Sequence, residues 1–519
     1  MKKLSLLVLA FLISYVVTAQ DIPFTMQKSK IFKDEYKNST IVLVEDDGQG
    51  GVIVIRSYQG SIFSGGYGYY FEHYGPDMTL IKESEYEMKF SEAIKLSSVL
   101  GIILNDDEIH IIDFMYNTDQ KAFVCSSNTA NISDFKFSKK ELFTLKSEEV
   151  KHFQYFNLFT SGGFDNDSGA SMIVNEDRTA FAVTVDINDK KAETHKVYLF
   201  DNDLVKKIDH TFKREVKDKK FRYENIDVSK DGNALYLLGK VYTDQKKKKK
   251  EGGKYQYELT RITKDSEKTQ VFDTEEHFSG SLKTIVFEDR VACIGFYSDK
   301  KDRRYKGISY FEMDPVTLAI RTTKYNPFTE QFIIDKYGKE KDKELKNLSF
   351  KKLFVTKNGD IVFNAEEFYI TTHHMSGPNS MGTTYYRYHF DDIVSAKVNS
   401  SGDMVWARNI NKRQVTGGED AFVSYSSTVK DNDTYFFINT GDKIKKLRND
   451  RIQFGQKSPN KSNLNVIRIK ENGDFDYQEI LDDKDNEVPF MVSEGAWTQS
   501  AMYFMGRKGK KKQLLKVTL

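Results

Sequence analysis

Apolar residues along this chain come in short runs or alternate with polar residues, and the spacing of an amphipathic helix is almost absent. Runs such as AFAVTV (residues 180–185) and ALYLL (residues 234–238) are rich in β-branched and aromatic residues. They end in clusters of Asp, Asn and Gly, which is typical of strands that stop at tight turns. The pattern predicts an all-β chain.

The same strand–turn–strand unit returns about every 64 residues. Several of its turns contain Asp-Gly or Asn-Gly pairs, which predict type I′ hairpins because such turns need positive φ at both central residues. The first seven turns are anchored at Asp47, Asp107, Asp177, Asp231, Asp289, Asn358 and Asp431. One further step reaches residue 495, where SEGAWTQSAMYFMG reads as an eighth hairpin.

Most units carry a second hairpin downstream, so each unit supplies four antiparallel strands. This predicts a β-propeller of four-stranded blades, with eight blades preferred and seven as the alternative. QLLKVTL at the C-terminus is expected to be the third strand of the last blade, and a strand near Phe24–Phe32 its fourth. Such pairing of the N- and C-terminal strands would remove the exposed edges of an open ring.

Over essentially the whole mature length, the repeat resembles the secreted bacterial β-propeller-like repeat proteins of an uncharacterised family. The Trp-Asp endings of WD40 repeats and the Gly-Gly pairs of kelch repeats are missing, and Ser400–Trp406 only hints at a sialidase Asp box. The resemblance therefore implies a fold and no catalytic residue.

Residues 1–19 read as a secretory signal peptide, followed by a single propeller domain over residues 20–519. Lys2 and Lys3 form a basic start, Leu4–Val17 an apolar core and Val17–Ala19 a small-residue cleavage site. The protein is therefore expected to be exported to the periplasm, the cell surface or the medium. No later stretch is apolar for long enough to cross a membrane.

The charge balance and the two cysteines bear on the partners and on the core of the protein. The chain has 78 Lys and Arg against 76 Asp and Glu, so nothing points to nucleic acid. Cys125 and Cys293 both lie in apolar runs and are expected to be buried, with their pairing left open. A monomer is expected.

Motifs for catalysis are absent: the chain has no G-x-S-x-G, H-E-x-x-H, G-x-x-x-x-G-K-[ST] or C-x-x-C sequence. We predict no cofactor and no metal. Calcium is the alternative at Phe164–Gly169 and Asp482–Glu487, where oxygens cluster without the spacing of a twelve-residue loop. His373, His374 and His389 offer imidazoles, but adjacent residues of a strand point to opposite faces.

Two long insertions, Thr371–Phe390 and Gly441–Asn463, are expected to project from one face of neighbouring blades, with Tyr58–Gly75 and Lys246–Lys250 at equivalent places. Elaborated loops on a rigid scaffold are where binding usually occurs. The candidate ligand-binding residues are Tyr69, Tyr70, His373, His374, Tyr385, Tyr386, Arg387 and Tyr388. The alternative is that the tyrosines extend strands and the lysines keep hairpin tips soluble.

These observations predict a secreted, non-enzymatic scaffold that binds an extracellular protein or glycan through the elaborated loops. The alternative is a hydrolase or lyase that acts on an extracellular polysaccharide with carboxylates near the central channel.

The mature protein is expected to begin at Gln20, because the small residues before it fit signal peptidase. N-terminal sequencing of exported protein checks this. Exported chains that retain Lys2 and Lys3 would contradict it.

Overall fold

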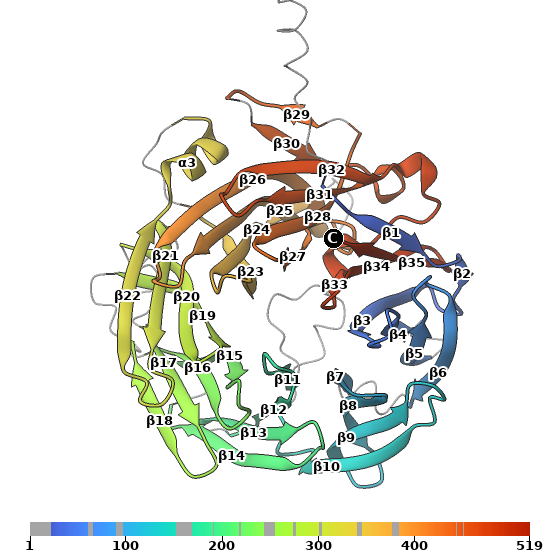
Figure 1. The fold of residues 1–519 in the computed structure, drawn as a ribbon, viewed down its shortest axis with the longest axis vertical. Helices are drawn as coiled ribbons and strands as arrows, with labels where there is room; N and C mark the ends of the chain where they lie inside the picture. Colours follow the sequence, from blue (N-terminus) through green and yellow to red (C-terminus); the bar gives the residue numbers. More distant parts are fainter. Residues whose placement is uncertain are drawn as a thin grey trace, which may run out of the picture.

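The computed structural model describes residues 22–60, 66–89, 97–151, 169–189, 191–216, 220–242, 255–272, 277–299, 304–339, 345–375, 383–442, 444–449 and 451–519. Strands dominate this part of the chain and form a ring of sheets (Figure 1). The one α-helix among the described residues is α3 (Glu330–Tyr337). In the described ranges no helix is long and apolar enough to cross a membrane.

The first five sheets each contain four strands that follow one another in the chain. Their bounds are β3 (Asn38–Asp46), β4 (Val52–Gln59), β5 (Tyr67–Tyr74), β6 (Leu80–Met88); β7 (Ser98–Asn105), β8 (Glu108–Asn117), β9 (Ala122–Asn131), β10 (Ser138–Lys146); β11 (Ala170–Val174), β12 (Ala180–Ile187), β13 (Glu193–Asp201), β14 (Lys206–Arg214); β15 (Phe221–Val228), β16 (Leu235–Tyr242), β17 (Tyr255–Ile262), β18 (Glu267–Val271); and β19 (Phe278–Phe287), β20 (Arg290–Ser298), β21 (Gly307–Met313), β22 (Ile320–Pro327).

The last three sheets are more elaborate. They contain β23 (Leu348–Val355), β24 (Ile361–Met375), β25 (Thr383–Val398), β26 (Met404–Thr416), β30 (Ile452–Gly455), β29 (Lys445–Lys446); β27 (Ser426–Lys430), β28 (Asp433–Thr440), β31 (Asn463–Ile469), β32 (Phe475–Leu481); and β33 (Ala496–Trp497), β34 (Met502–Lys508), β35 (Lys511–Thr518), β1 (Thr25–Lys28), β2 (Phe32–Lys33). Three short 3-10 helices lie between them: η3 (Pro459–Lys461), η4 (Asp483–Asp485) and η5 (Val492–Glu494).

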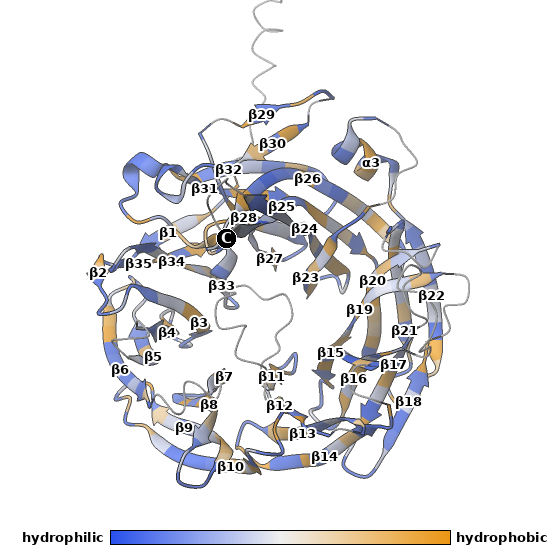
Figure 2. Cartoon of the chain, turned by 180° about the vertical axis from the view of Figure 1, so that it is seen from behind, coloured by the Kyte–Doolittle hydropathy of each residue, from blue (hydrophilic) through white to orange (hydrophobic). Residues whose placement is uncertain are grey.

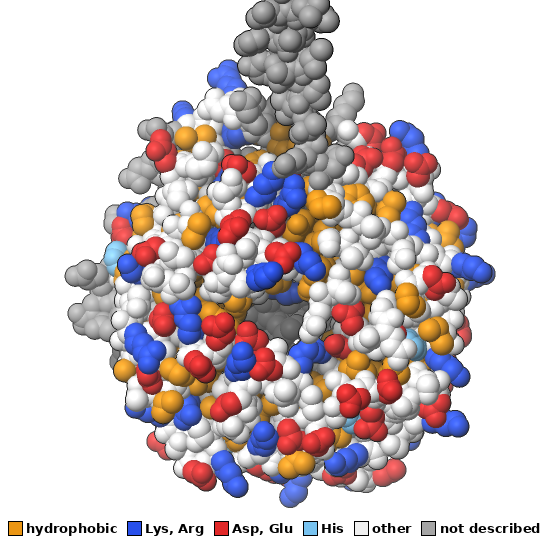
Figure 3. Space-filling model, in the orientation of Figure 1, with side chains coloured by type: hydrophobic (Ala, Val, Ile, Leu, Met, Phe, Trp, Pro, Cys, Tyr) orange, Lys and Arg blue, Asp and Glu red, His pale blue; other side chains and the backbone are white. Residues whose placement is uncertain are grey.

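The described strands thus form eight sheets, and the predicted all-β, propeller-like architecture is confirmed. Pairing within the sheets is antiparallel except for β26 and β30, which run parallel. The first strand of each sheet lies toward the centre of the ring and the last toward its rim (Figure 1). In the space-filling view the ring is hollowed at its centre, and acidic and basic side chains are interspersed over the face (Figure 3).

The predicted type I′ turns are wrong. In the turn between β15 and β16, Gly232 N donates to Ser229 O and Ser229 N donates to Ala234 O. Gly232 has φ 61°, whereas Asp231 is not in the left-handed region. Gly359 likewise has φ 76°, whereas Asn358 before it is not in the left-handed region. A longer turn forms instead, in which only the Gly of the Asp-Gly or Asn-Gly pair is left-handed. Glycine is therefore favoured at that position alone.

The two ends of the chain meet in the last sheet, as predicted. β1 pairs with β35 in the register Thr25↔Thr518 to Lys28↔Leu515, and β2 adds a second contact at Phe32↔Lys512. The N-terminal segment therefore covers the outer edge that β35 would otherwise expose.

The hydrophobic core is divided among the interfaces between neighbouring sheets. Phe296 on β20 and Phe363 on β24, for example, pack edge to face with ring centroids 4.7 Å apart. Outermost strands such as β18 are largely exposed and hydrophilic (Figure 2). Cys125 on β9 and Cys293 on β20 are buried, free and in different sheets.

A buried charge cluster links the N-terminal segment to the first sheet. Arg56 on β4 is 1% exposed. Its guanidinium contacts Glu72 through Nε at 2.8 Å and through Nη2, and it contacts Asp34 at 2.8 Å. Burial lowers the pKa of Arg56, but the Glu72 and Asp34 carboxylates outweigh burial and raise it overall. The cation is therefore fully compensated inside the protein.

Replacing Glu72 by Ala is expected to lower the free energy of unfolding by about 3–5 kcal/mol, because it leaves the Arg56 cation buried with one partner fewer. Denaturant titration measures this. Glu87→Ala, an exposed carboxylate on the neighbouring β6, is the control and should change stability by under about 0.5 kcal/mol. Equal effects of the two substitutions would contradict the prediction.

Candidate functional site

One face of the ring carries the elaborated connections. Because successive strands of a sheet run in opposite directions, the loops between second and third strands emerge on the same side as the links between sheets. We call this side the loop face. It carries helix α3, residues 417–423, residues 441–462 and the end of the β24–β25 hairpin. Residues 61–65, 243–254 and 376–382, which include Lys246–Lys250, lie outside the described residues.

The first insertion is a long β-hairpin. β24 and β25 pair from Ile361↔Val398 to Met375↔Thr383, whereas the pairing of β25 with β26 ends at Tyr388↔Thr416. Beyond that point the hairpin continues with two strands only. We call residues 369–375 and 383–389 the ribbon.

Strand alternation divides the predicted ribbon residues between its two sides. On one side the rings of His373 and Tyr385 stack with centroids 5.2 Å apart, and the Arg387 guanidinium lies 5.7 Å from the Tyr385 ring. On the other side His374 Nδ1 lies 2.9 Å from Thr384 Oγ1, and Tyr386 is 51% exposed.

The imidazoles of the ribbon do not converge on one point. Thr371 Oγ1 lies 3.2 Å from His373 Nε2 and 2.9 Å from His389 Nε2, so these two rings share one hydroxyl. His374 is on the opposite side of the ribbon from both. Tyr388 lies at its root, in register with Thr416 of β26.

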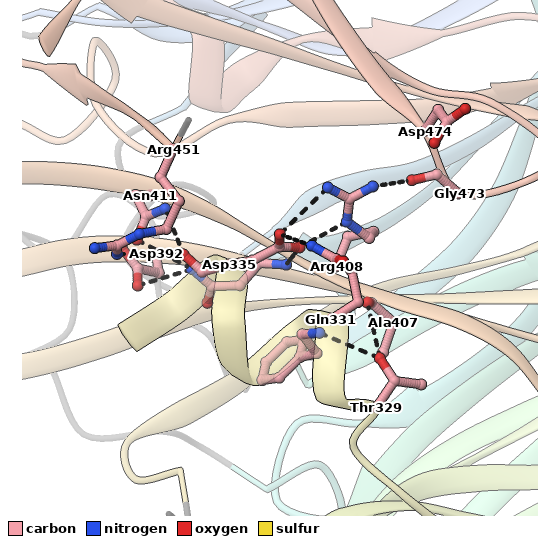
Figure 4. Close-up of polar contacts among 12 residues, drawn as sticks. Thr329, Gln331, Asp335, Asp392, Ala407, Arg408, Asn411, Arg451, Gly473 and Asp474 are labelled. Carbon is pink, nitrogen blue, oxygen red and sulfur yellow. Dashed lines mark hydrogen bonds and ion pairs between the residues drawn. The ribbon is translucent and has the colours of Figure 1, made fainter. Parts of the chain in front are cut away.

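Helix α3 braces the root of the ribbon (Figure 4). Thr329 caps the helix by accepting a hydrogen bond from Phe332 N at 3.2 Å, and Gly338, at φ 70°, ends it. Near the last turn, Asp335 accepts from Arg408 Nε of β26 at 2.6 Å. The hydrophobic pattern did not predict this helix, whose sequence signals are the Thr329 cap and the closing Gly338.

Two lysines form ion pairs with carboxylates of the same sheet. Lys336 of α3 lies 2.8 Å from both Glu367 and Asp392, which belong to β24 and β25. Burial lowers the pKa of Lys336, but these carboxylates outweigh it and raise the pKa overall. Lys412 contacts Glu366 at 2.7 Å, and both side chains are fully buried. The ribbon therefore stands on a rigid base.

The second insertion joins the same sheet. β30 pairs with β26 in the register Asn411↔Gln453 to Arg413↔Gly455, and β29 pairs with β30. Arg451 donates to Lys336 O at 3.0 Å, at the end of α3, and Figure 4 shows Arg451 beside Asp335 of the same helix. Strands of both insertions thus belong to one six-stranded sheet. The second insertion carries seven basic residues: Lys443, Lys445, Lys446, Arg448, Arg451, Lys457 and Lys461. Lys443 lies outside the described residues.

A cleft of about 850 Å³ opens on the loop face between the first and last sheets. Tyr58, Tyr67 and Tyr69 line one side. The other side is lined by Glu494 and Arg507 together with Gly418, Glu419, Ala421 and Phe422, which follow the end of β26. Backbone and polar side chains of residues 37–40 complete it.

The tyrosines of the cleft are held firmly. Tyr58 stacks on Tyr36 with ring centroids 4.8 Å apart, and its hydroxyl donates to Glu85 at 2.6 Å. Tyr69 is 8% exposed, and its hydroxyl accepts from Val99 N at 3.3 Å. Tyr58 and Tyr69 are thus largely covered by the protein, and Tyr67 is the half-buried ring that suits a ligand with flat apolar faces and polar edges.

Tyr70, the neighbour of Tyr69 among the predicted binding residues, does not line this cleft. Its ring packs 4.6 Å from Tyr58 and 4.8 Å from the Arg56 guanidinium. The register Arg56↔Tyr70 and Tyr58↔Gly68 puts Tyr70 on the same side of the sheet as Arg56 and Tyr58, in the buried charge cluster, whereas Tyr69 is on the opposite side.

The charges that line the cleft balance. Arg507 pairs with Glu419, and burial lowers the pKa of Arg507. Burial raises the pKa of Glu494, whose carboxylate accepts a hydrogen bond from the Thr40 hydroxyl. Lys37 is the remaining charged side chain of the lining. The cleft therefore offers hydroxyls, amides and rings rather than a field of one sign.

The cleft carries no signal in the sequence, because its walls come from residues near 40, 60, 420 and 500. Of the calcium alternatives, residues 164–168 lie outside the described residues. At the other, Asp482 caps η4 by accepting from Lys484 N at 2.9 Å, and Glu487 pairs with Lys511.

The chain matches no known protein-family model and no curated protein sequence. Among solved structures it is similar to the β-propeller domain of the Trilobed protease from Pyrococcus furiosus, with 9% identity and a TM-score of 0.37 over 87% of this chain and 98% of that one. Prolyl oligopeptidase B from Galerina marginata matches with 10% identity and a TM-score of 0.38 over 91% of this chain, which spans 56% of the enzyme. The polysaccharide lyase Uly1 matches with 10% identity and a TM-score of 0.34 over 80% of this chain and 89% of that one.

Proposed function

We propose that this chain is an exported, monomeric propeller of eight blades that binds an extracellular glycan or protein on its loop face without catalysing a reaction. The observation that carries the proposal is the cleft of about 850 Å³ with fixed tyrosines along one side. Its size is that of a small-molecule or oligosaccharide site.

The chemistry of the cleft favours a neutral glycan. Sugar rings present flat C–H faces that pack on aromatic rings and hydroxyl edges that need hydrogen-bond partners. Tyr67, the half-buried one of the three tyrosines, supplies a ring, and Asn38, Ser57 and Gln59 supply donors and acceptors beside it. Because the ionic side chains of the lining balance, a strongly charged ligand gains little there.

The ribbon supports the protein alternative. Tyr386 and Ile370 are 51% and 50% exposed on it, and the buried pairs at its base keep it in place. Exposed aromatic groups on a rigid support are typical of anchors in protein interfaces.

Replacing Tyr67 by Ala is expected to weaken glycan binding roughly 5- to 30-fold, since one covered aromatic ring contributes about 1–2 kcal/mol. The measurement is calorimetric titration with the neutral polysaccharides laminarin, xyloglucan and mannan, with alginate as the acidic comparison. Tyr386→Ala on the ribbon is the matched control and should leave glycan binding unchanged.

The results separate the two ligand classes. If none of the neutral polysaccharides binds, the glycan proposal is wrong. Should Tyr386→Ala weaken glycan binding as much as Tyr67→Ala, the ligand spans the ribbon rather than the cleft alone.

Glu494 is the observation that favours the enzymatic alternative. A carboxyl with a raised pKa in a cleft is what a general acid of a polysaccharide hydrolase requires. It ends η5 and is separated by one residue from β33, the strand of the last sheet nearest the centre of the ring (Figure 1).

Glu494→Gln tests both functions. The folded protein holds this proton more tightly than the unfolded chain, so the carboxyl costs stability as the pH rises above its ordinary pKa of 4.5. The variant is therefore expected to melt at a higher temperature than the wild type at neutral pH, with the difference vanishing at acid pH. It should also bind the same polysaccharide. Release of sugar ends by the wild type and not by the variant would establish the enzymatic alternative.

A further inference from the structure

A second polar cluster lies on the loop face, in the sheet formed by β11–β14. Asp186 is at the end of β12, and Glu193 and His195 are at the start of β13. Asp186 and His195 are directly opposite in the register of the two strands. Glu193 is two positions before His195, so all three side chains leave the same side of the sheet.

The ligand-type atoms of these residues converge. One atom from each of Asp186, Glu193 and His195 lies within 4.8 Å of the other two. His195 Nε2 is 2.9 Å from Glu193 Oε1, and these two side chains are only 4% and 6% exposed. Asp186 Oδ1 is fully covered and has no hydrogen-bond partner among the described residues.

Aromatic rings keep water away from the imidazole. The His195 ring lies 5.1 Å from the ring of Tyr223, 6.3 Å from Phe212 and 6.4 Å from Phe221. Tyr223 and Phe221 belong to β15 of the next sheet, so the cluster sits at an interface between two sheets. A covered carboxylate oxygen without a hydrogen-bond partner is costly, and a cation bound beside it would offset that cost.

Among the described residues, two cations face the cluster from other elements. Lys151, which precedes the third sheet, lies 3.2 Å from Asp186 Oδ2. Arg214 of β14 is opposite Glu193 in the register, but its guanidinium is bound to Glu258 at 2.9 and 3.0 Å. Lys151 is thus the group that a metal ion would compete with.

We propose that Asp186, Glu193 and His195 form a binding site for a divalent transition metal, with Zn²⁺ the best fit. An imidazole nitrogen together with two carboxylate oxygens is a mixed donor set that Zn²⁺ accepts, whereas Ca²⁺ takes six to eight oxygens. In a tetrahedral zinc shell the ligand atoms lie about 3.3 Å apart, which small side-chain rotations reach from the present separations. The two carboxylates neutralise the ion.

Other histidine–carboxylate pairs lack the third ligand. His73 lies 2.8 Å from Asp47 and His210 lies 2.7 Å from Glu267. Within the described ranges, only Asp186, Glu193 and His195 bring three such side chains together. The His195–Glu193 pair accounts for two members of this cluster, and Lys151 pairs with Asp186 Oδ2, which leaves Asp186 Oδ1 without a hydrogen-bond partner among the described residues.

The test is a titration of the metal-free full chain against a chromophoric zinc chelator. All proteins carry His389→Ala, because His373 and His389 of the ribbon share the Thr371 hydroxyl and offer a second, weaker pair of donors. One Zn²⁺ per chain is expected. His195→Ala and Glu193→Gln should each weaken binding about 100-fold or more, since each removes or neutralises a direct ligand.

Two further variants sharpen the result. Lys151→Met removes the competing ammonium and is expected to tighten Zn²⁺ binding. His210→Ala, which breaks a histidine–glutamate pair without a third ligand, should bind as the parent does. Glu193→Gln keeps the size of the side chain, so it decides the matter if His195→Ala fails to fold. A parent protein that binds no Zn²⁺, or a Glu193→Gln protein that binds it as the parent does, would overturn the proposal.

Discussion

The structure depends on the hydrogen bonds between β1 and β35. Ser29 and Leu514 are 485 positions apart, yet Ser29 Oγ accepts from Leu514 N at 2.9 Å. Without this pairing the last sheet would lack its outer strand and would present an open edge. Closure also brings residues 37–40 and Arg507 to the same cleft. The proposed ligand site therefore exists only in the closed ring, and this long-range pairing must form before it.

Buried charges fix the parts of the loop face that regular sheets leave free. Arg56 joins the N-terminal segment to the first sheet, and Lys412, Lys336 and Arg408 join the ribbon, helix α3 and β26. A buried ion pair adds little stability compared with apolar residues of the same volume, but removing one partner is costly. We infer that these pairs select one arrangement of the insertions. A ribbon with only two strands needs such a base to hold its exposed rings in a constant position.

The two proposed sites make different use of the same architecture. The cleft is assembled from distant segments and offers rings and neutral polar groups to an extended ligand. The metal site is built from one hairpin, with β15 of the next sheet as its cover. Loss of the metal site would therefore disturb one sheet interface and leave the cleft intact, so the two proposals fail or succeed separately.

The sequence alone determined the features that depend on neighbours along the chain. Alternating apolar residues and recurring Asp/Gly turns identify the strands and their grouping, and the strand-like remnants at the two ends indicate closure, because hydrophobic periodicity and turn chemistry are local. Helix α3 was within reach of the same reasoning through Thr329 and Gly338, but eight residues are a weak periodic signal. Only the tertiary structure decided that Tyr69 lines a cleft while Tyr70 contacts Arg56, and that Glu494 lies beside Thr40. Each of these depends on which side of a strand faces which neighbouring segment, and such non-local contacts leave no pattern in the order of the residues.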